Sequence, residues 1–322
     1  MQPRSPLCRD VFRRLPAGVV AAVLAVGPAV AQRALFTDAE IAAAIQRRGP
    51  AIEGAIAEDI PAMLPREKRA GTAGIRVEFV ARGPHPLSIF SDPATRRIIV
   101  PMETVLFIDD FATATAWFDE RGCERGYLQT YLSALLQGGE PLQRPLEAFA
   151  IDRETTLADA SVDDLSSKGY HGMLLFLFAH EMGHVVLGHA VGLTGEASRA
   201  QEIAADGFAL DYFEGAGAPP IDMAEYFVAA RWLDPTETAA AAASHPVSTG
   251  RLRAIAERLS ADPRAFARAF ADPEEGVELT LGVARDMTTV ADLLSEEWMV
   301  SVMPMALARD FPLSRLATAC PS

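Results

Sequence analysis

A continuous apolar run near the middle of the chain is its strongest pattern of hydrophobic positions. Residues 173–179 are all apolar, and apolar side chains recur as far as Leu193, with polar ones embedded from His180 onward. The stretch is long enough to be considered a membrane span, but the embedded histidines and glutamate argue against one. We therefore expect this stretch to form the core helix of a soluble domain.

The remaining patterns predict a mainly helical chain with a few strands. Residues 35–46 have helical periodicity, and Thr37 with Glu40 three residues later matches a capping box. Residues 75–80 alternate as a β-strand does. We also expect strands at 98–100, 105–108 and 277–283, helices at 111–137 (interrupted near Gly122 and Gly126), 196–213, 222–271 and 291–303, and a polar loop with short helices at 138–169. That loop either borders a functional cleft or is a simple connector.

The central helix carries the pattern H-E-x-x-H at residues 180–184. Residues four apart on a helix lie about 40° from each other, so His180 and His184 share a face and can bind one metal ion. Glu181 lies about 100° round from His180, where its carboxylate can reach a water on that ion. Two imidazoles and a base are the core of a zinc hydrolase.

A third ligand is needed, since catalytic zinc usually has three protein ligands and a water. One class of zinc peptidases has a histidine six residues after the second, but residue 190 here is alanine. On an unbroken helix His189 lies opposite His180, so we expect it, like His171, to be structural, capping or solvent-facing.

The predicted helix at 196–213 offers a better ligand. Glu202 and Asp206 lie four residues apart and share a face. Glu202 completes a His, His, Glu site, and Asp206 can accept the free N–H of a ligand histidine and so fix its tautomer. Glu196 is the rival ligand, but it has no acid four residues later. We therefore assign the metal to His180, His184 and Glu202.

A third motif follows an alanine-rich stretch. Ser244, His245 and Pro246 are followed by Arg251, and Pro246 suits the first turn of a new helix. A histidine and an arginine here could hydrogen-bond the oxyanion that forms when water attacks a peptide carbonyl.

Together, in this order, the three motifs resemble the gluzincin metallopeptidases of the HtpX, CAAX-prenyl-protease and BepA type. The resemblance covers about 75 residues, from Leu177 to Leu252. It implies zinc on His180, His184 and Glu202, Glu181 as general base and acid, and His245 and Arg251 beside the substrate or the transition-state oxygen. It also implies an α+β, mainly helical, zincin-like fold, with a small sheet whose edge strand pairs with the substrate backbone.

The start of the chain has the pattern of a secretory signal. Four arginines precede an apolar run from Leu15 to Val30, and Ala29-Val30-Ala31 fits a cleavage site before Gln32. An uncleaved membrane anchor is the alternative. We therefore predict a signal peptide at 1–31, a metallopeptidase domain at 32–272 and a C-terminal segment at 273–322 packed on that domain. The predicted location is periplasmic or secreted, with no membrane span in the mature chain.

Charge and cysteines refine the location and the partners. Cleavage after Ala31 removes four arginines and one aspartate and shifts the formal net charge from −14 to −17. Such an acidic chain disfavours nucleic acid as a partner. Cys123 and Cys320 remain after cleavage, and in an oxidising compartment they either form one disulfide or stay free.

These observations predict an exported zinc metalloendopeptidase that binds one Zn²⁺ per chain. Its substrates would be polypeptides, such as unfolded or misassembled envelope proteins in quality control. The alternative is a non-cleaving binding or chaperone-like protein with a structural zinc site. An aminopeptidase would need a group that anchors the substrate amine, and the sequence offers no motif for one.

Overall fold

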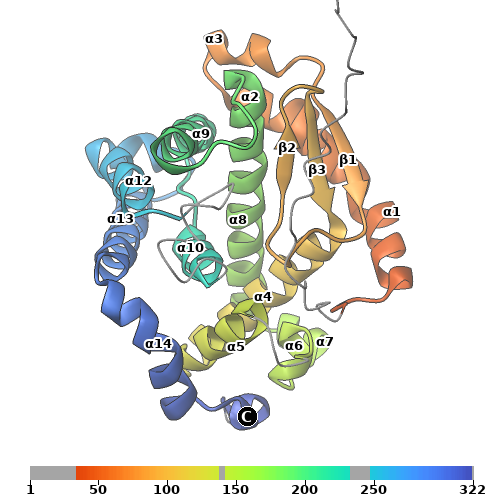
Figure 1. The fold of residues 1–322 in the computed structure, drawn as a ribbon, viewed down its shortest axis with the longest axis vertical. Coiled ribbons are helices and arrows are strands. Elements are labelled where there is room, and N and C mark those ends of the chain that lie inside the picture. Colours follow the sequence, from red (N-terminus) through yellow and green to blue (C-terminus); the bar gives the residue numbers. More distant parts are fainter. Residues whose placement is uncertain (1–33, 138–141, 233–246, 321–322) are drawn as a thin grey trace, which may run out of the picture. The chain divides into compact units, whose positions relative to one another are not determined.

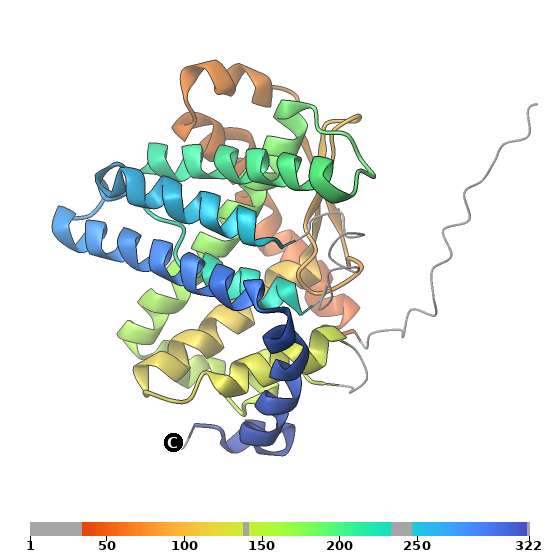
Figure 2. The same cartoon turned by 60° about the vertical axis from the view of Figure 1, so that its left-hand side comes forward.

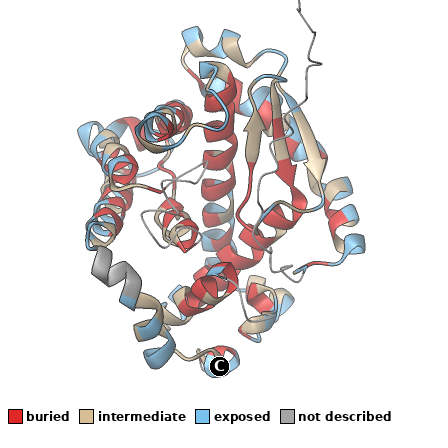
Figure 3. Ribbon diagram, in the orientation of Figure 1, coloured by how far each residue is buried: buried red, intermediate tan, exposed pale blue. Residues whose placement is uncertain are grey.

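A long helix, α8 (Ala160–Leu187), runs through the centre of the fold. The computed structural model describes residues 34–137, 142–232 and 247–320. On one side of α8 lies a small β-sheet, and on the other lie α9, α10, α12 and α13 (Figure 1). Along most of its length α8 is buried (Figure 3), because both groups of elements and α4 pack against it. The predicted buried core helix is therefore confirmed.

The sheet has three strands in the order β1-β3-β2. β1 (Arg76–Val80) pairs in parallel with β3 (Arg97–Pro101), and β3 pairs antiparallel with β2 (Phe90–Asp92). β1 and β3 were expected, whereas β2, which is only three residues long, was not. β2 is an edge strand of the sheet and contacts α8. One edge of its backbone pairs with β3, and the other edge faces away from the sheet, on the side of α8.

The N-terminal half is mostly helical, as expected. The capping box is confirmed, because the Thr37 side chain accepts from the Glu40 N–H and the Glu40 carboxylate accepts from the Thr37 N–H. The elements are α1 (Asp38–Gly54), η1 (Ala55–Asp59), α2 (Ile60–Met63), α3 (Arg66–Arg69), η2 (Ala70–Thr72), α4 (Met102–Glu120), α5 (Gly126–Gln137), α6 (Pro145–Ala148) and α7 (Arg153–Leu157). The predicted interruption near Gly122 and Gly126 separates α4 from α5.

Two predicted strands are wrong. Residues 105–108 belong to α4, which is buried on nearly every side and so lacks the polar face that marks a helix in a sequence. Residues 277–283 belong to α13, whose buried positions recur at helical spacing, at Gly276, Thr280, Val283, Ala284 and Met287. The polar segment 138–169 was expected to be a loop with short helices, but its last ten residues, 160–169, are the beginning of α8.

In the C-terminal half, α9 and α10 pack against α8 on the side away from the sheet, and α12 and α13 lie outside them (Figure 2). Its elements are α9 (Gly195–Ala216), α10 (Met223–Arg231), α12 (Thr249–Ala261), η3 (Pro263–Phe266), α13 (Pro273–Ser295), α14 (Glu297–Asp310) and η4 (Leu313–Thr318). α13 packs along α12. Cys123 and Cys320 form a disulfide with a Cα–Cα distance of 5.5 Å, which ties the C-terminal segment to the turn between α4 and α5. Among the described residues, none of the helices combines the length and the apolar character that crossing a membrane requires.

A close approach of α8 and α9 positions the site described below. A Cβ added at Gly183, inside the H-E-x-x-H pattern, would lie 3.0 Å from the Cβ of Phe208 and 3.2 Å from the Cα of Ala205. Glycine therefore lets the two helices pack at this point with little room between their backbones. Because Glu202 lies one turn before Asp206 on α9, this contact brings its carboxylate toward the two histidines of α8.

Candidate metal centre

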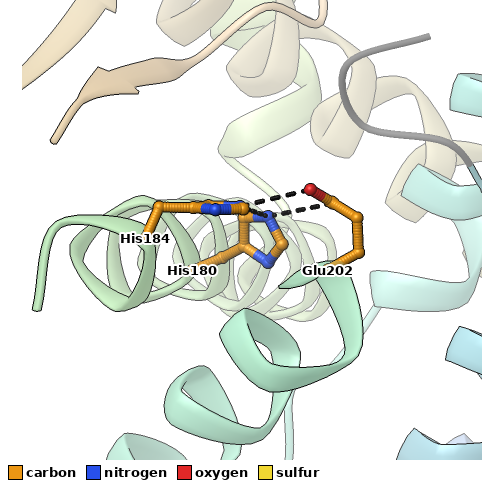
Figure 4. A group of neighbouring side chains, drawn as sticks. All are labelled: His180, His184 and Glu202. Atoms are coloured by element: carbon orange, nitrogen blue, oxygen red, sulfur yellow. Dashed lines mark hydrogen bonds and ion pairs between the residues drawn. The ribbon is translucent and has the colours of Figure 1, made fainter. Parts of the chain in front are cut away.

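Three buried side chains from α8 and α9 form a group that could hold a metal ion. One potential ligand atom from each of His180, His184 and Glu202 lies within 4.8 Å of the others. Their side chains point toward one another (Figure 4), with the Nε2 atoms of the two histidines 3.0 Å apart. The Glu202 carboxylate oxygens lie 3.4 Å from His180 Nε2 and 3.3 Å from His184 Nε2. The structure thus brings together the three predicted ligands.

The rival acid Glu196 and the histidine His171 lie outside this group. Glu196 is exposed in the first turn of α9. His171 bonds within its own helix, where its Nδ1 lies 2.8 Å from the Ser167 carbonyl oxygen. His245, predicted to flank the substrate, lies outside the described residues.

Each histidine presents Nε2 to the centre and Nδ1 to an outer partner. His180 Nδ1 lies 2.8 Å from Asp206 Oδ1, the arrangement expected for a carboxylate that fixes the tautomer of a ligand histidine. His184 Nδ1 lies 2.8 Å from Nδ1 of His189. On a continuous helix His189 would lie on the far side from His180, but α8 ends at Leu187. Gly188 adopts φ 66° and ψ 39°, which turns the chain so that His189 comes back against His184.

Arg251 of α12 binds both acids of the site. Its Nη1 lies 2.8 Å from Glu202 Oε2, and its Nε and Nη2 each lie 2.8 Å from an oxygen of Asp206. Glu202 and Asp206 are each only 1% exposed, and Arg251 is 4% exposed. This cation offsets the cost of burying two carboxylates side by side. We predicted Arg251 beside the substrate; it does line the cleft described below, but its guanidinium contacts the acids that support the centre.

The buried charges shift the pKa values of the group. For Asp206, burial raises the pKa, but Arg251 and His180 outweigh it and the net pKa is lowered. Burial lowers the pKa of His180, but hydrogen bonds to Asp206 and Glu202 outweigh it and raise the pKa to about 10. Burial, together with the charge of His180, lowers the pKa of His184. The raised pKa of His180 favours its protonated form, and metal ligation through Nε2 requires release of that proton.

Glu181 lies beside this group and is held by a strand residue. Its carboxylate is buried, and Ser91 of the edge strand β2 donates its hydroxyl to Glu181 Oε2 at 2.7 Å. The sequence predicts Glu181 but not Ser91, because nothing in the short segment at 90–92 marks it as a strand beside the helix. The glutamate is therefore positioned by both α8 and the sheet.

A cleft of about 600 Å³ opens beside His180 and Glu181. The segment 84–91, which leads into β2, forms one wall of the cleft. The part of α8 just before His180 and helix α10 form others. Most of the lining is apolar and includes Leu87, Ile89, Phe176, Leu177, Phe227 and Ala230. The Tyr226 hydroxyl donates to the Leu87 carbonyl at 3.4 Å and so joins two of the walls.

A smaller hollow of about 70 Å³ lies on the other side, against His184, His189 and Glu202. His180 lines the larger space, and His184 and Glu202 line the smaller one, so the metal-capable group borders both. None of the described residues of the segment 142–169 is among those that line this cleft.

Residues 170–271 match the family model Peptidase U49. Neither the curated proteins nor the solved structures contain a significant match. The matched region begins on α8 and contains the three candidate ligands, Glu181, Asp206 and Arg251. The match supports a peptidase, and a His, His, Glu group fits such an enzyme.

Proposed function

We propose that this protein is an exported zinc-dependent metalloendopeptidase. One observation carries the proposal, namely that the buried His180, His184 and Glu202 converge beside Glu181, and that His180 and Glu181 line a cleft. Two imidazole nitrogens and one carboxylate oxygen are a ligand set of catalytic zinc sites, which leave a further position for water or substrate. Cys123 and Cys320, joined as a disulfide, support export, because such bonds persist in oxidising compartments.

The chain's own residues can carry the proton transfers of peptide hydrolysis. Bound at this site, zinc would supply Lewis-acid chemistry, which polarises a carbonyl and lowers the pKa of water. The Glu181 carboxylate accepts a proton from the attacking water and later passes it to the leaving amine. Ser91 holds one carboxylate oxygen of Glu181, which leaves the other available for that proton. Asp206 and Arg251 keep Nε2 of His180 directed into the site.

The composition of the cleft favours an endopeptidase. An aminopeptidase needs an acidic group to bind the free amine of its substrate. Among the described residues that line the cleft, Glu181 is the only carboxylate, and we assign it to proton transfer. The edge strand β2 beside the site suits an extended backbone. By its resemblance to the HtpX, CAAX-prenyl-protease and BepA type, the substrates we propose are unfolded or misassembled envelope proteins.

Metal content and proteolysis test this function directly. We expect the purified protein to contain about one zinc per chain by elemental analysis and to cleave an unfolded substrate such as reduced casein. A chelator should stop cleavage, and added zinc should restore it. A protein that takes up no zinc after addition of the metal ion, and that cleaves no unfolded substrate, contradicts the proposal.

The apolar cleft makes a further expectation testable. Ala230 of α10 lines it, so Ala230→Phe should fill the space that a bulky apolar substrate side chain would occupy. For peptides with a bulky apolar side chain beside the cleaved bond, we expect kcat/KM to fall by about 10- to 100-fold. For peptides with alanine beside the cleaved bond, kcat/KM should change little. Val228→Phe is the control, because Val228 lines a different hollow on the same helix. Equal losses for both peptide classes would show that the cleft does not select side chains.

A further inference from the structure

The two histidines of the metal-capable group are supported in different ways. His180 is held by Asp206, and this carboxylate is in turn bound by Arg251. His184 has the imidazole of His189 at the equivalent position, with the two Nδ1 atoms 2.8 Å apart and the ring planes at 76°. Ligand histidines usually give their second N–H to a carboxylate, a carbonyl or a water. The imidazole of His189 is therefore an unusual partner for a ligand histidine, and its role has to be inferred from the geometry of this chain.

The roles of the two rings follow from the ligand assignment. If Nε2 of His184 binds a metal ion, it must present its lone pair, so the proton of this neutral ring is on Nδ1. The hydrogen bond then runs from His184 Nδ1 to His189 Nδ1, which accepts. His189 in turn is placed by the end of α8. Its backbone N–H donates to the His184 carbonyl at 3.0 Å, directly after the left-handed turn at Gly188.

We propose that His189 is a positioning residue of the metal centre, which accepts the Nδ1–H of His184 and holds Nε2 of His184 toward the ion. The inference rests on the proposed zinc site and extends it to a residue outside the ligand set. His189 lines the small hollow next to His184 and Glu202, so its ring lies at the site and not on a remote surface. Without this acceptor, the His184 ring can turn about its side-chain bonds, and metal binding must then order it.

Two substitutions separate the hydrogen bond from the bulk of the side chain. His189→Leu keeps an apolar group of similar size but removes the acceptor, whereas His189→Asn keeps an acceptor oxygen near the position of Nδ1. We expect His189→Leu to weaken zinc binding by about 10- to 100-fold, measured by competition with a chromophoric chelator. His189→Asn should bind zinc within a few-fold of the wild type. His171→Leu, elsewhere on α8, is the control for loss of a histidine and should bind normally.

A spectroscopic measurement tests positioning apart from folding. With Co²⁺ in place of zinc, His189→Leu should shift or broaden the visible absorption bands, and His189→Asn should restore them. The melting temperatures of the metal-free proteins should agree, because the loss concerns the ligand and not the fold. Wild-type zinc affinity in His189→Leu would overturn the inference, as would equally weak binding by both variants.

These outcomes are distinct from a failure of the proposed function. If the wild-type protein binds no zinc, the metal site itself is wrong. If the wild-type protein binds zinc and His189→Leu binds it equally well, only the role of His189 is wrong.

Discussion

Glu181→Gln is expected to keep about one zinc per chain and to lose peptidase activity by about 10²- to 10⁴-fold in kcat. Glu181 lies outside the three-residue group that could hold the ion, so its charge is not needed for metal binding. Glutamine has the same size, and its side-chain oxygen can still accept the hydrogen bond from Ser91. What it loses is a group that can take and return a proton. The fall should therefore appear in kcat, with KM little changed.

Glu196→Gln is the matched control for this experiment. Glu196 is an exposed glutamate at the start of α9, outside the metal-capable group, so its replacement should leave both zinc content and kcat unchanged. Loss of zinc from Glu181→Gln would show that Glu181 is a ligand. If the wild type binds zinc and unfolded clients but cleaves none, and Glu181→Gln behaves identically, the non-cleaving binding protein becomes the better description.

Arg251→Met should lower the free energy of unfolding of the metal-free protein by about 3–5 kcal/mol. Arg251 is buried and binds Glu202 and Asp206, which are buried as well. Removing one partner of a buried ion pair leaves an uncompensated charge, and here two carboxylates would remain. The guanidinium also lies over the Phe227 ring at 5.2 Å, a contact that a methionine side chain only partly replaces. Urea denaturation in the presence of a chelator measures the effect.

Arg258→Met on the same helix is the control for Arg251→Met. Arg258 lies two turns later and binds Asp211 and Glu214, but its side chain is 40% exposed. Partly exposed ion pairs contribute about 0–1 kcal/mol, so this substitution should cost much less. Equal losses in the two variants would mean that the Arg251 pairs are not as buried as the structure shows.

Several features were predictable because they are local. The four-residue spacing of His180 and His184 places both on one face of any helix, whatever packs around it. The spacing of Glu202 and Asp206 does the same for α9. The capping box at Thr37 and Glu40 depends only on residues three apart. In each case the interacting groups lie within about one helical turn, so the backbone geometry alone brings them together.

Other elements were misread because their surroundings decide their form. Val105 and Ile108 lie in a short apolar run that fits either a strand or a buried helix, and the burial of α4 on nearly every side settles it. His189 was placed on a continuous helix, but a glycine in the left-handed conformation at position 188 ends α8 and reverses the chain. Periodicity cannot show such a break, because Gly188 is also compatible with a helix that continues.

The sequence by itself determined which side chains can carry the chemistry, because His180, Glu181 and His184 share one helix and Glu202 with Asp206 share another. Only the tertiary structure decided how these groups are connected. The close packing of α8 on α9 brings Glu202 to the two histidines, Arg251 of α12 binds both Glu202 and Asp206, and the edge strand brings Ser91 to Glu181. The contacts of Arg251 with Asp206 and of Ser91 with Glu181 join residues 45 and 90 positions apart. Their formation depends on which surfaces the fold buries against each other, and no spacing along the chain encodes it.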